Sequence, residues 1–185
     1  MKVHTSTGRL DGARWLRSPN YDARPVGIEP ELIVIHNISL PPGKFGGRWI
    51  EALFTNQLDA RAHPYFAQIH QIKVSAHLLV HRSGVMTQFV PFHLRAWHAG
   101  ESCYRGRMCC NDFSIGIELE GTDDIPYERV QYERLAAVIR ALLTAYPTLS
   151  EHSIAGHEHI APQRKTDPGP AFDWMLLRQL FENKK

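Results

Sequence analysis

The run ELIVIHN at residues 31–37 constrains the fold more than any other segment. It is short, rich in β-branched residues and apolar almost to its end, which is typical of a strand buried on both faces. Two polar residues, His36 and Asn37, end the run, so we expect the carboxyl end of this strand to reach a surface or a cleft. Sites in α/β proteins are usually built at such strand ends.

A second strand is predicted over FSIGIELEG, residues 113–121. Because side chains alternate along a strand, its apolar residues should share one face, and Ser114, Gly116, Glu118 and Glu120 should share the other. The sequence SAHLLVH, then RSG, then VMTQFV predicts a β-hairpin over residues 75–90, with glycine in the turn.

Apolar residues at helical spacing predict helices over residues 48–56, 62–70 and 127–146, and a short closing helix near 174–181. The segment SIAGH at 153–157 is interpreted as strand-like or loop. Strands interspersed with helices, plus a hairpin, imply an α/β protein: a single domain with a central mixed β-sheet flanked by α-helices. We assign residues 1–185 to this one domain, with a core of about 30–182.

Charge and hydropathy exclude several classes of partner. The formal net charge of +2 is too small to favour nucleic acid or an anionic membrane surface. No apolar run approaches the roughly 20 residues of a membrane span, and the first eighteen residues lack the apolar core of a secretory signal. We therefore expect a cytoplasmic protein. Three cysteines without a C-x-x-C pair are expected to be inert thiols, with a cysteine nucleophile as the alternative.

Eleven histidines raise the possibility of a metal site. HEHIA lacks the second histidine of H-E-x-x-H, so a helical zincin site is excluded. On an extended chain His157 and His159 would face opposite ways, so at most one should join a common site. His36, His157 and Asp167 would supply the three protein ligands of a catalytic zinc. Spacing alone does not select this trio: the alternatives are that His36 is a half-buried histidine that donates to a carbonyl, and that Asp167 is a turn residue before Pro168.

Glu118 is the second candidate for chemistry. On its strand it either lines a cleft or lies on a solvated sheet face, and Glu120 on the same face makes the solvated interpretation reasonable. No G-x-S-x-G elbow supports a nucleophilic serine, and neither a P-loop nor a dinucleotide glycine pattern occurs.

Several motifs taken together carry a resemblance to a known family. They cover most of the chain in order: VIHNISLPPG (34–43), HPYF (63–66), VSAHLLVHRSG (74–84), RAWHAG (95–100), CNDFSIGIELEGTD (110–123), and GH with IAPQRKTDPGPAFDW (156–174). With them the chain resembles the AmpD-type 1,6-anhydro-N-acetylmuramoyl-L-alanine amidases, within the wider N-acetylmuramoyl-L-alanine amidase type 2 and peptidoglycan-recognition superfamily.

The resemblance implies a mechanism and a set of site residues. It implies that His36, His157 and Asp167 bind one catalytic Zn²⁺, that Glu118 is the general base for the attacking water, and that Lys165 stabilises the oxyanion. The candidates for substrate binding are Asn37, Tyr65, Lys73 and Trp97. Lys73 stands where relatives often carry arginine, and lysine lacks the bidentate fork of arginine.

The implied substrate is a 1,6-anhydro-N-acetylmuramyl peptide, cleaved in the cytoplasm between the muramic acid and L-alanine during peptidoglycan recycling. No obligate protein partner is indicated. Two alternatives stay open: a non-catalytic peptidoglycan-recognition module, and a lytic amidase that acts on intact cell wall. Such recognition modules often lose a metal ligand, whereas this chain keeps all five residues that the resemblance assigns to chemistry.

Overall fold

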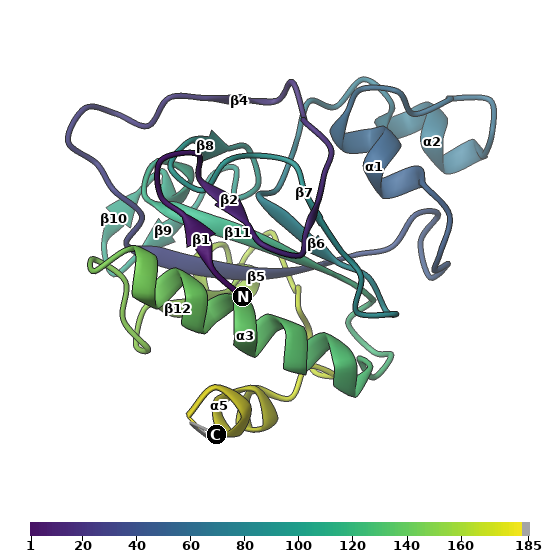
Figure 1. Ribbon diagram of the computed structural model, residues 1–185. Helices are drawn as coiled ribbons and strands as arrows, with labels where there is room; N and C mark the ends of the chain where they lie inside the picture. The colour runs from purple at the N-terminus through teal and green to yellow at the C-terminus, as the bar shows by residue number, and fades with distance from the viewer. Residues whose placement is uncertain (183–185) are drawn as a thin grey trace.

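A six-stranded mixed sheet forms the centre of the computed structural model, which describes residues 1–182 (Figure 1). Its order is β12–β5–β11–β6–β7–β3. Strands β12, β5, β11 and β6 run parallel, β6 and β7 form the predicted antiparallel hairpin, and β3 is parallel to β7. The strands of this sheet are β3 (Arg14–Trp15), β5 (Leu32–Ile38), β6 (Leu78–Val80), β7 (Met86–Gln88), β11 (Ser114–Glu120) and β12 (Ile154–Gly156). The predicted α/β class and mixed sheet are confirmed.

The helices lie where apolar spacing predicts them, with one addition. They are α1 (Trp49–Phe54), α2 (Pro64–Ile69), α3 (Arg129–Ala145), α4 (His157–Ile160) and α5 (Trp174–Glu182), together with a 3-10 turn η1 (Cys110–Asp112). The single turn α4 is the addition. Three further pairs of two-residue strands are β1 (Val3–His4) with β2 (Arg9–Leu10), β4 (Tyr21–Asp22) with β8 (Arg95–Ala96), and β9 (Cys103–Tyr104) with β10 (Arg107–Met108).

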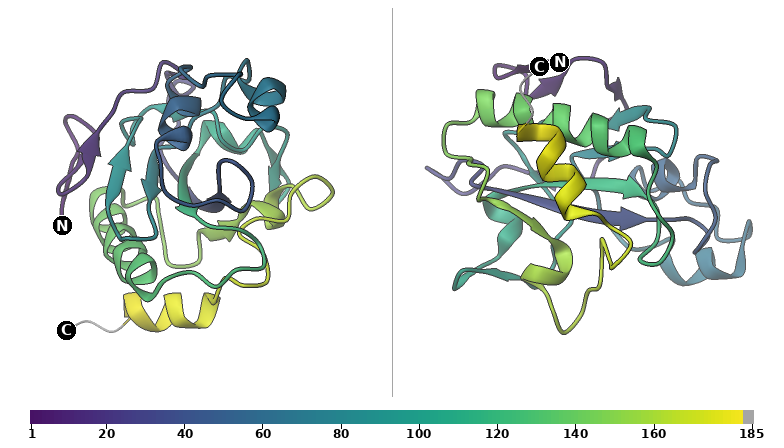
Figure 2. Two further views of the ribbon diagram at one scale, coloured as in Figure 1. Left: turned by 90° about the vertical axis from the view of Figure 1, so that its right-hand side faces the viewer. Right: turned by 90° about the horizontal axis from the view of Figure 1, so that it is seen from below.

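Helix α3 covers one face of the sheet, and α5 packs against α3 (Figure 1; Figure 2, right). The apolar stripe of α3 meets the odd-numbered side chains of β5 and β11 in the largest core cluster. Fully buried Leu135, Ile139 and Leu142 belong to that stripe, and burying each side chain contributes roughly 1.5–3 kcal/mol. Because side chains alternate, the even-numbered residues of both strands face the other side of the sheet.

Helices α1 and α2 stand beyond the end of the sheet toward which β5 runs, as Figure 1 shows. The local sequence explains where α2 begins. The ring nitrogen Nδ1 of His63 accepts the backbone N–H of Tyr65 at 3.1 Å, and Pro64 occupies the first helical turn, where a missing N–H costs nothing. Phe54 and Phe66 from the two helices are buried in a second apolar cluster with Phe89.

The N-terminal segment packs onto this domain although the sequence predicted no elements there. Val3 and Leu10 are buried in the same cluster as the α3 stripe. The domain limits of 1–185 stay a prediction, and residues 183–185 lie outside the described part of the chain. No helix within residues 1–182 has both the length and the apolar character needed to cross a membrane.

Candidate active site

Three side chains that could bind a metal converge at the carboxyl ends of β5 and β12. His36 comes from β5, His157 is the first residue of α4, which directly follows β12, and Asp167 lies in the loop after α4. His36 Nδ1 lies 2.9 Å from His157 Nδ1 and 3.2 Å from Asp167 Oδ2, and His157 Nδ1 lies 3.0 Å from Asp167 Oδ2. Within residues 1–182 these are the residues that group as a possible metal site.

The geometry of these three atoms suits a tetrahedral ion. Ligands at the usual zinc distances of about 2.0–2.1 Å would be roughly 3.3 Å apart, close to the observed spacings. His157 Nε2 lies 3.2 Å from the carbonyl oxygen of Ala99. A carbonyl can only accept, so a neutral His157 carries its proton on Nε2 and offers the Nδ1 lone pair to the cluster. Two nitrogens and one carboxylate oxygen form a donor set typical of catalytic zinc.

Glu118 shares the sheet face of His36. The two residues are register partners on adjacent parallel strands, and Glu118 is 8% exposed. Its Oε2 atom is buried and has no hydrogen-bond partner among residues 1–182. Burial raises the pKa of Glu118 well above its usual value, the charge of Asp167 raises it further, and Lys165 lowers it. A carboxyl group in this environment is suited to proton transfer.

The pKa values of Asp167 and His36 are both lowered, which favours the protonation states that can bind a metal. Burial would raise the pKa of Asp167, but hydrogen bonding with His157 and His36 outweighs it and holds that pKa well below its usual range. Burial lowers the pKa of His36 to about 4. The carboxyl group is therefore ionised and the imidazole neutral at pH 7, which are the forms that bind metals.

A cleft of about 420 Å³ opens onto these groups. Its polar wall contains His36, Glu118, His157, Lys165 and Asp167. Its apolar wall comes mainly from α1, α2 and the segments beside them: Leu40, Leu53, Phe54, Tyr65, Ile69, Ile72, Val74 and Trp97. The larger hollow between the N-terminal segment and α3 holds none of the predicted site residues.

The four predicted substrate-binding residues are placed differently. Tyr65 and Trp97 line the cleft, and the indole Nε1 of Trp97 donates to Asp22 Oδ1 at 3.3 Å. Lys73 is exposed and lies outside the cleft lining. Asn37 borders the cleft, but its amide donates to Asp123 Oδ1 at 2.8 Å and to the carbonyl of Pro168 at 3.1 Å. The side chain of Asn37 thus holds the residue that follows Asp167.

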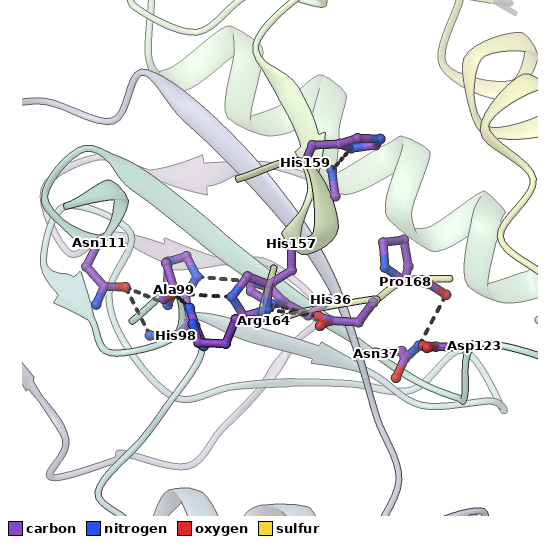
Figure 3. A network of polar contacts seen from close by, with 12 residues as sticks. His36, Asn37, His98, Ala99, Asn111, Asp123, His157, His159, Arg164 and Pro168 are labelled. Carbon is purple, nitrogen blue, oxygen red and sulfur yellow. Dashed lines mark hydrogen bonds and ion pairs between the residues drawn. The ribbon is translucent and has the colours of Figure 1, made fainter. Parts of the chain in front are cut away.

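The segment around His159 differs from the extended chain that the sequence suggested. His157 to Ile160 form the helical turn α4, so the argument from strand alternation was wrong. Two residues on a helix still point about 200° apart. His159 Nδ1 accepts the backbone N–H of Gly156 at 2.8 Å, and its ring packs on Trp174, away from His36 and His157 (Figure 3).

The solvated interpretation of the Glu118 face is also wrong. Every residue of β11 is buried. Glu120 accepts backbone N–H groups from Gly46 at 2.6 Å and Arg82 at 3.0 Å, so its carboxylate has partners outside the cleft.

Sequence reasoning missed the residues that support the site, including Asn111 and Asp123. Both lie inside the CNDFSIGIELEGTD motif. Their side chains contact backbone N–H groups and another amide, namely His98 N, Ala99 N and Asn37 Nδ2. Such partners leave no periodic or compositional signal, so membership in the motif was the one available clue.

Comparison with known proteins agrees with this geometry. The family model described as N-acetylmuramoyl-L-alanine amidase matches residues 26–170. The 1,6-anhydro-N-acetylmuramyl-L-alanine amidase AmpD of Escherichia coli strain K12 is 60% identical over 177 residues, which is 96% of this chain and 96% of that protein.

Solved structures are similar as well. The crystal structure of an AmpD Se-Met derivative superposes with a TM-score of 0.94 at 57% identity, covering 97% of this chain and 99% of that one. A complex of the E. coli amidase AmiD with anhydro-N-acetylmuramic acid-L-Ala-D-γ-Glu-L-Lys has a TM-score of 0.58 at 30% identity. That match covers 85% of this chain and 60% of the other.

Proposed function

This chain belongs to the N-acetylmuramoyl-L-alanine amidase family, and on that premise we propose that it is a zinc-dependent hydrolase of 1,6-anhydro-N-acetylmuramyl peptides. The bond cleaved is the amide between the lactyl group of the anhydro-muramic acid and L-alanine. The observation that carries the proposal is the convergence of His36, His157 and Asp167 at the cleft that also contains Glu118.

His36, His157 and Asp167 are the proposed zinc ligands. When bound, zinc supplies Lewis acidity, which polarises the scissile carbonyl and can lower the pKa of a water to about 7. The near-tetrahedral spacing of the three ligand atoms supports this assignment. Two neutral imidazoles and one carboxylate would leave the loaded site with a net positive charge, which favours an oxyanion.

Glu118 is the proposed general base. Its unpartnered Oε2 can accept the proton of the attacking water and then deliver it to the amine of the departing L-alanine. Lys165, on the polar wall, would stabilise the negative charge that develops on the carbonyl oxygen. The water that Glu118 deprotonates and the oxygen that Lys165 stabilises are bonded to the same carbon in the tetrahedral intermediate. Both side chains must therefore face the cleft, and both are in its lining.

The apolar wall of the cleft is the proposed surface for the sugar. Trp97 is half-buried, and its ring is anchored by Asp22, which Arg95 in turn holds with two hydrogen bonds of 2.6 and 2.5 Å. A fixed aromatic ring can cover an apolar sugar face at low entropic cost. Tyr65 and Asn37 are proposed to complete the binding surface, and Lys73 to attract a carboxylate of the stem peptide from outside the cleft.

We place this activity in the cytoplasm, on cell-wall fragments that are being recycled. The support is sequence similarity: the AmpD of E. coli is 60% identical over 96% of this chain, whereas the sequence match to AmiD covers 50% of it. Retention of all three ligand residues together with Glu118 argues against a non-catalytic recognition module. A lytic amidase of intact cell wall is the remaining alternative.

Two measurements test the proposal. Purified protein should carry about one zinc per chain by elemental analysis, and mass spectrometry should detect the L-Ala-peptide released from anhydro-muropeptide. The matched control is polymeric peptidoglycan, which should be cleaved far more slowly. Full activity without metal would refute the mechanism, and preference for the polymer would favour the lytic alternative.

A further inference from the structure

One irregular segment, His98–Ala99–Gly100, contacts both of the predicted histidine ligands. It follows β8 and belongs to no strand or helix. Figure 3 shows His98 and Ala99 beside His36 and His157, with Asn111 on the far side of the segment. Because an irregular segment lacks the hydrogen-bond ladder of a sheet, other groups must fix its position.

His36 is held by the side chain of His98. His36 Nε2 lies 2.9 Å from His98 Nδ1, and His98 Nε2 lies 3.1 Å from Ser114 Oγ. If Nδ1 of His36 is to offer a lone pair to a metal, its proton must be on Nε2 and be donated to His98 Nδ1. A neutral His98 then carries its own proton on Nε2 and donates it to Ser114. Metal binding is therefore compatible with one direction of this hydrogen-bonded chain.

The position of the His98 ring is set by close packing on β11. A Cβ atom at Gly116 would come within 2.4 Å of His98 Cγ, so the ring lies directly on the glycine backbone. Any side chain at position 116 would push His98 away from His36.

His157 is held by the backbone of the same segment. Its Nε2 donates to the Ala99 carbonyl at 3.2 Å, and Arg164 Nη2 donates to that carbonyl at 2.6 Å and to Glu101 O at 2.7 Å. A shift of Ala99 would therefore rotate or release the His157 ring. Both ligands thus depend on where residues 98–100 lie.

Asn111 fixes that position. Its Oδ1 atom accepts the backbone N–H of His98 at 3.1 Å and of Ala99 at 2.8 Å. Asn111 is itself anchored, because the buried Arg24 donates to the carbonyls of Asn111 and Asp112 at 3.2 and 2.9 Å. One amide oxygen therefore links a rigid turn to the segment that orients both histidines.

We propose that Asn111 is a positioning residue for the metal centre, which orients His36 through the His98 side chain and His157 through the Ala99 carbonyl. The inference rests on the proposed function, since it assumes that these histidines bind the metal. Partners that orient a ligand typically contribute 10–100-fold in metal affinity.

The test measures zinc affinity by competition with a chromophoric chelator, and the absorption spectrum of the cobalt-substituted protein, in full-length variants. Asn111→Ala should lose roughly 10–100-fold in zinc affinity and change the cobalt spectrum. Asn111→Asp keeps an oxygen that accepts both N–H groups, and its added charge favours a cation, so its zinc affinity should stay near that of the wild type.

Gln88→Ala is the matched control for a general loss of stability. Gln88 is also a buried amide that binds backbone groups, namely Leu10 N, Gly8 O and Val90 O, but it lies outside the cleft lining. It should lower the melting temperature without altering zinc affinity. Arg164→Ala provides a second test of the segment in case Asn111→Ala does not fold. Arg164 is exposed, so its loss should leave the fold intact. The zinc affinity of this variant should also fall, because the Ala99 carbonyl that accepts from His157 loses a second donor.

The outcomes separate this inference from the proposed function. A wild-type chain that binds no zinc would refute the proposed function. A wild-type chain that binds zinc tightly, with Asn111→Ala and Arg164→Ala unchanged, would overturn the positioning role alone. Equal losses in Asn111→Ala and Asn111→Asp, or in Asn111→Ala and Gln88→Ala, would also overturn it.

Discussion

Substituting Glu118 with glutamine separates proton transfer from binding. The change is nearly isosteric and affects a residue that is 8% exposed, whose Oε2 atom has no hydrogen-bond partner in the described part of the chain. Glu118 is not one of the three grouped ligand residues. The variant should therefore fold, keep about one zinc per chain and bind substrate, while losing the group that takes a proton from water.

The expected loss of turnover follows from that single role. A positioned general base contributes about 10²–10⁴-fold, which corresponds to roughly 3–5 kcal/mol of activation free energy at 1.36 kcal/mol per decade. KM should change little, because the amide keeps the shape of the carboxylate. Both kcat and kcat/KM should fall together, as expected when an interaction made in the transition state is lost.

The same substitution should increase the stability of the metal-free protein, although it decreases turnover. Burial and the charge of Asp167 raise the pKa of Glu118 in the folded state. As the pH rises above the unfolded-state pKa of about 4.3, the unfolded chain loses this proton more readily than the folded one, which lowers the free energy of unfolding. Glutamine removes that penalty. The metal-free variant should therefore melt at a higher temperature than the wild type at pH 7, and the gain should vanish below about pH 4, where the carboxyl is neutral in both states.

Release of L-Ala-peptide from anhydro-muropeptide, followed by mass spectrometry beside a zinc assay, measures these effects. Glu158→Gln is the matched control, because Glu158 is next to His157 in sequence yet has a side chain 31% exposed and lies outside the cleft lining. It should keep near-normal turnover. Glu118→Gln with its zinc bound and activity within tenfold of the wild type would refute the assignment of the base, and loss of zinc would show that Glu118 is a ligand.

Three further outcomes are expected. Asp167→Asn should leave purified protein with little zinc after dialysis, because the anionic ligand is gone; retention of one zinc per chain would contradict its role. Asn37→Ala should weaken zinc binding about tenfold in chelator competition, since Pro168 next to Asp167 loses a donor; unchanged affinity would limit Asn37 to other roles. Burial lowers the pKa of His36 to about 4 and of His77 to about 3, so the unfolded chain takes up these protons first. Glu118, whose pKa is raised, opposes this trend over the same pH range. Urea unfolding of the metal-free Glu118→Gln protein should therefore show stability falling from about pH 6.5 toward pH 4, and a flat profile in that variant would contradict the burial of neutral histidines.

Much of the fold could be predicted because its main elements have strong periodicity. Strand β5 is a continuous apolar run, the β6–β7 hairpin has glycine in its turn, and α3 carries an unbroken apolar stripe. Each pattern is set by burial of one face or of both. Strands of two residues, such as β3, contain no repeat for a pattern to detect. Their existence depends on a partner strand far along the chain, as with Arg14 opposite Thr87.

The residues of the candidate site were predictable to a different extent. His36 and Glu118 stood out as polar residues on apolar strands, but their opposition depends on the parallel register of β5 with β11, which neither strand specifies alone. The same register places Glu120 opposite Ile38, two residues beyond the pair of Glu118 and His36, where backbone N–H groups of Gly46 and Arg82 donate to its carboxylate. Two glutamates that look equivalent along the strand therefore differ, because Glu120 has backbone partners whereas Glu118 Oε2 has none within residues 1–182.

The sequence did not predict the roles of Asn111 and Gly116, because these roles also depend on the tertiary structure. Asn111 acts through backbone N–H groups of an irregular segment, so its contacts depend on chain path and not on the types of side chain that it meets. Gly116 contributes by having no side chain, because a Cβ atom at this position would overlap the His98 ring. A hydrogen bond from backbone N–H groups to an amide oxygen produces no pattern of charge or hydropathy in the sequence, and neither does a missing side chain. The sequence therefore indicates the candidate metal ligands of this protein, whereas the orientation of their side chains depends on backbone and amide groups that occur in every loop.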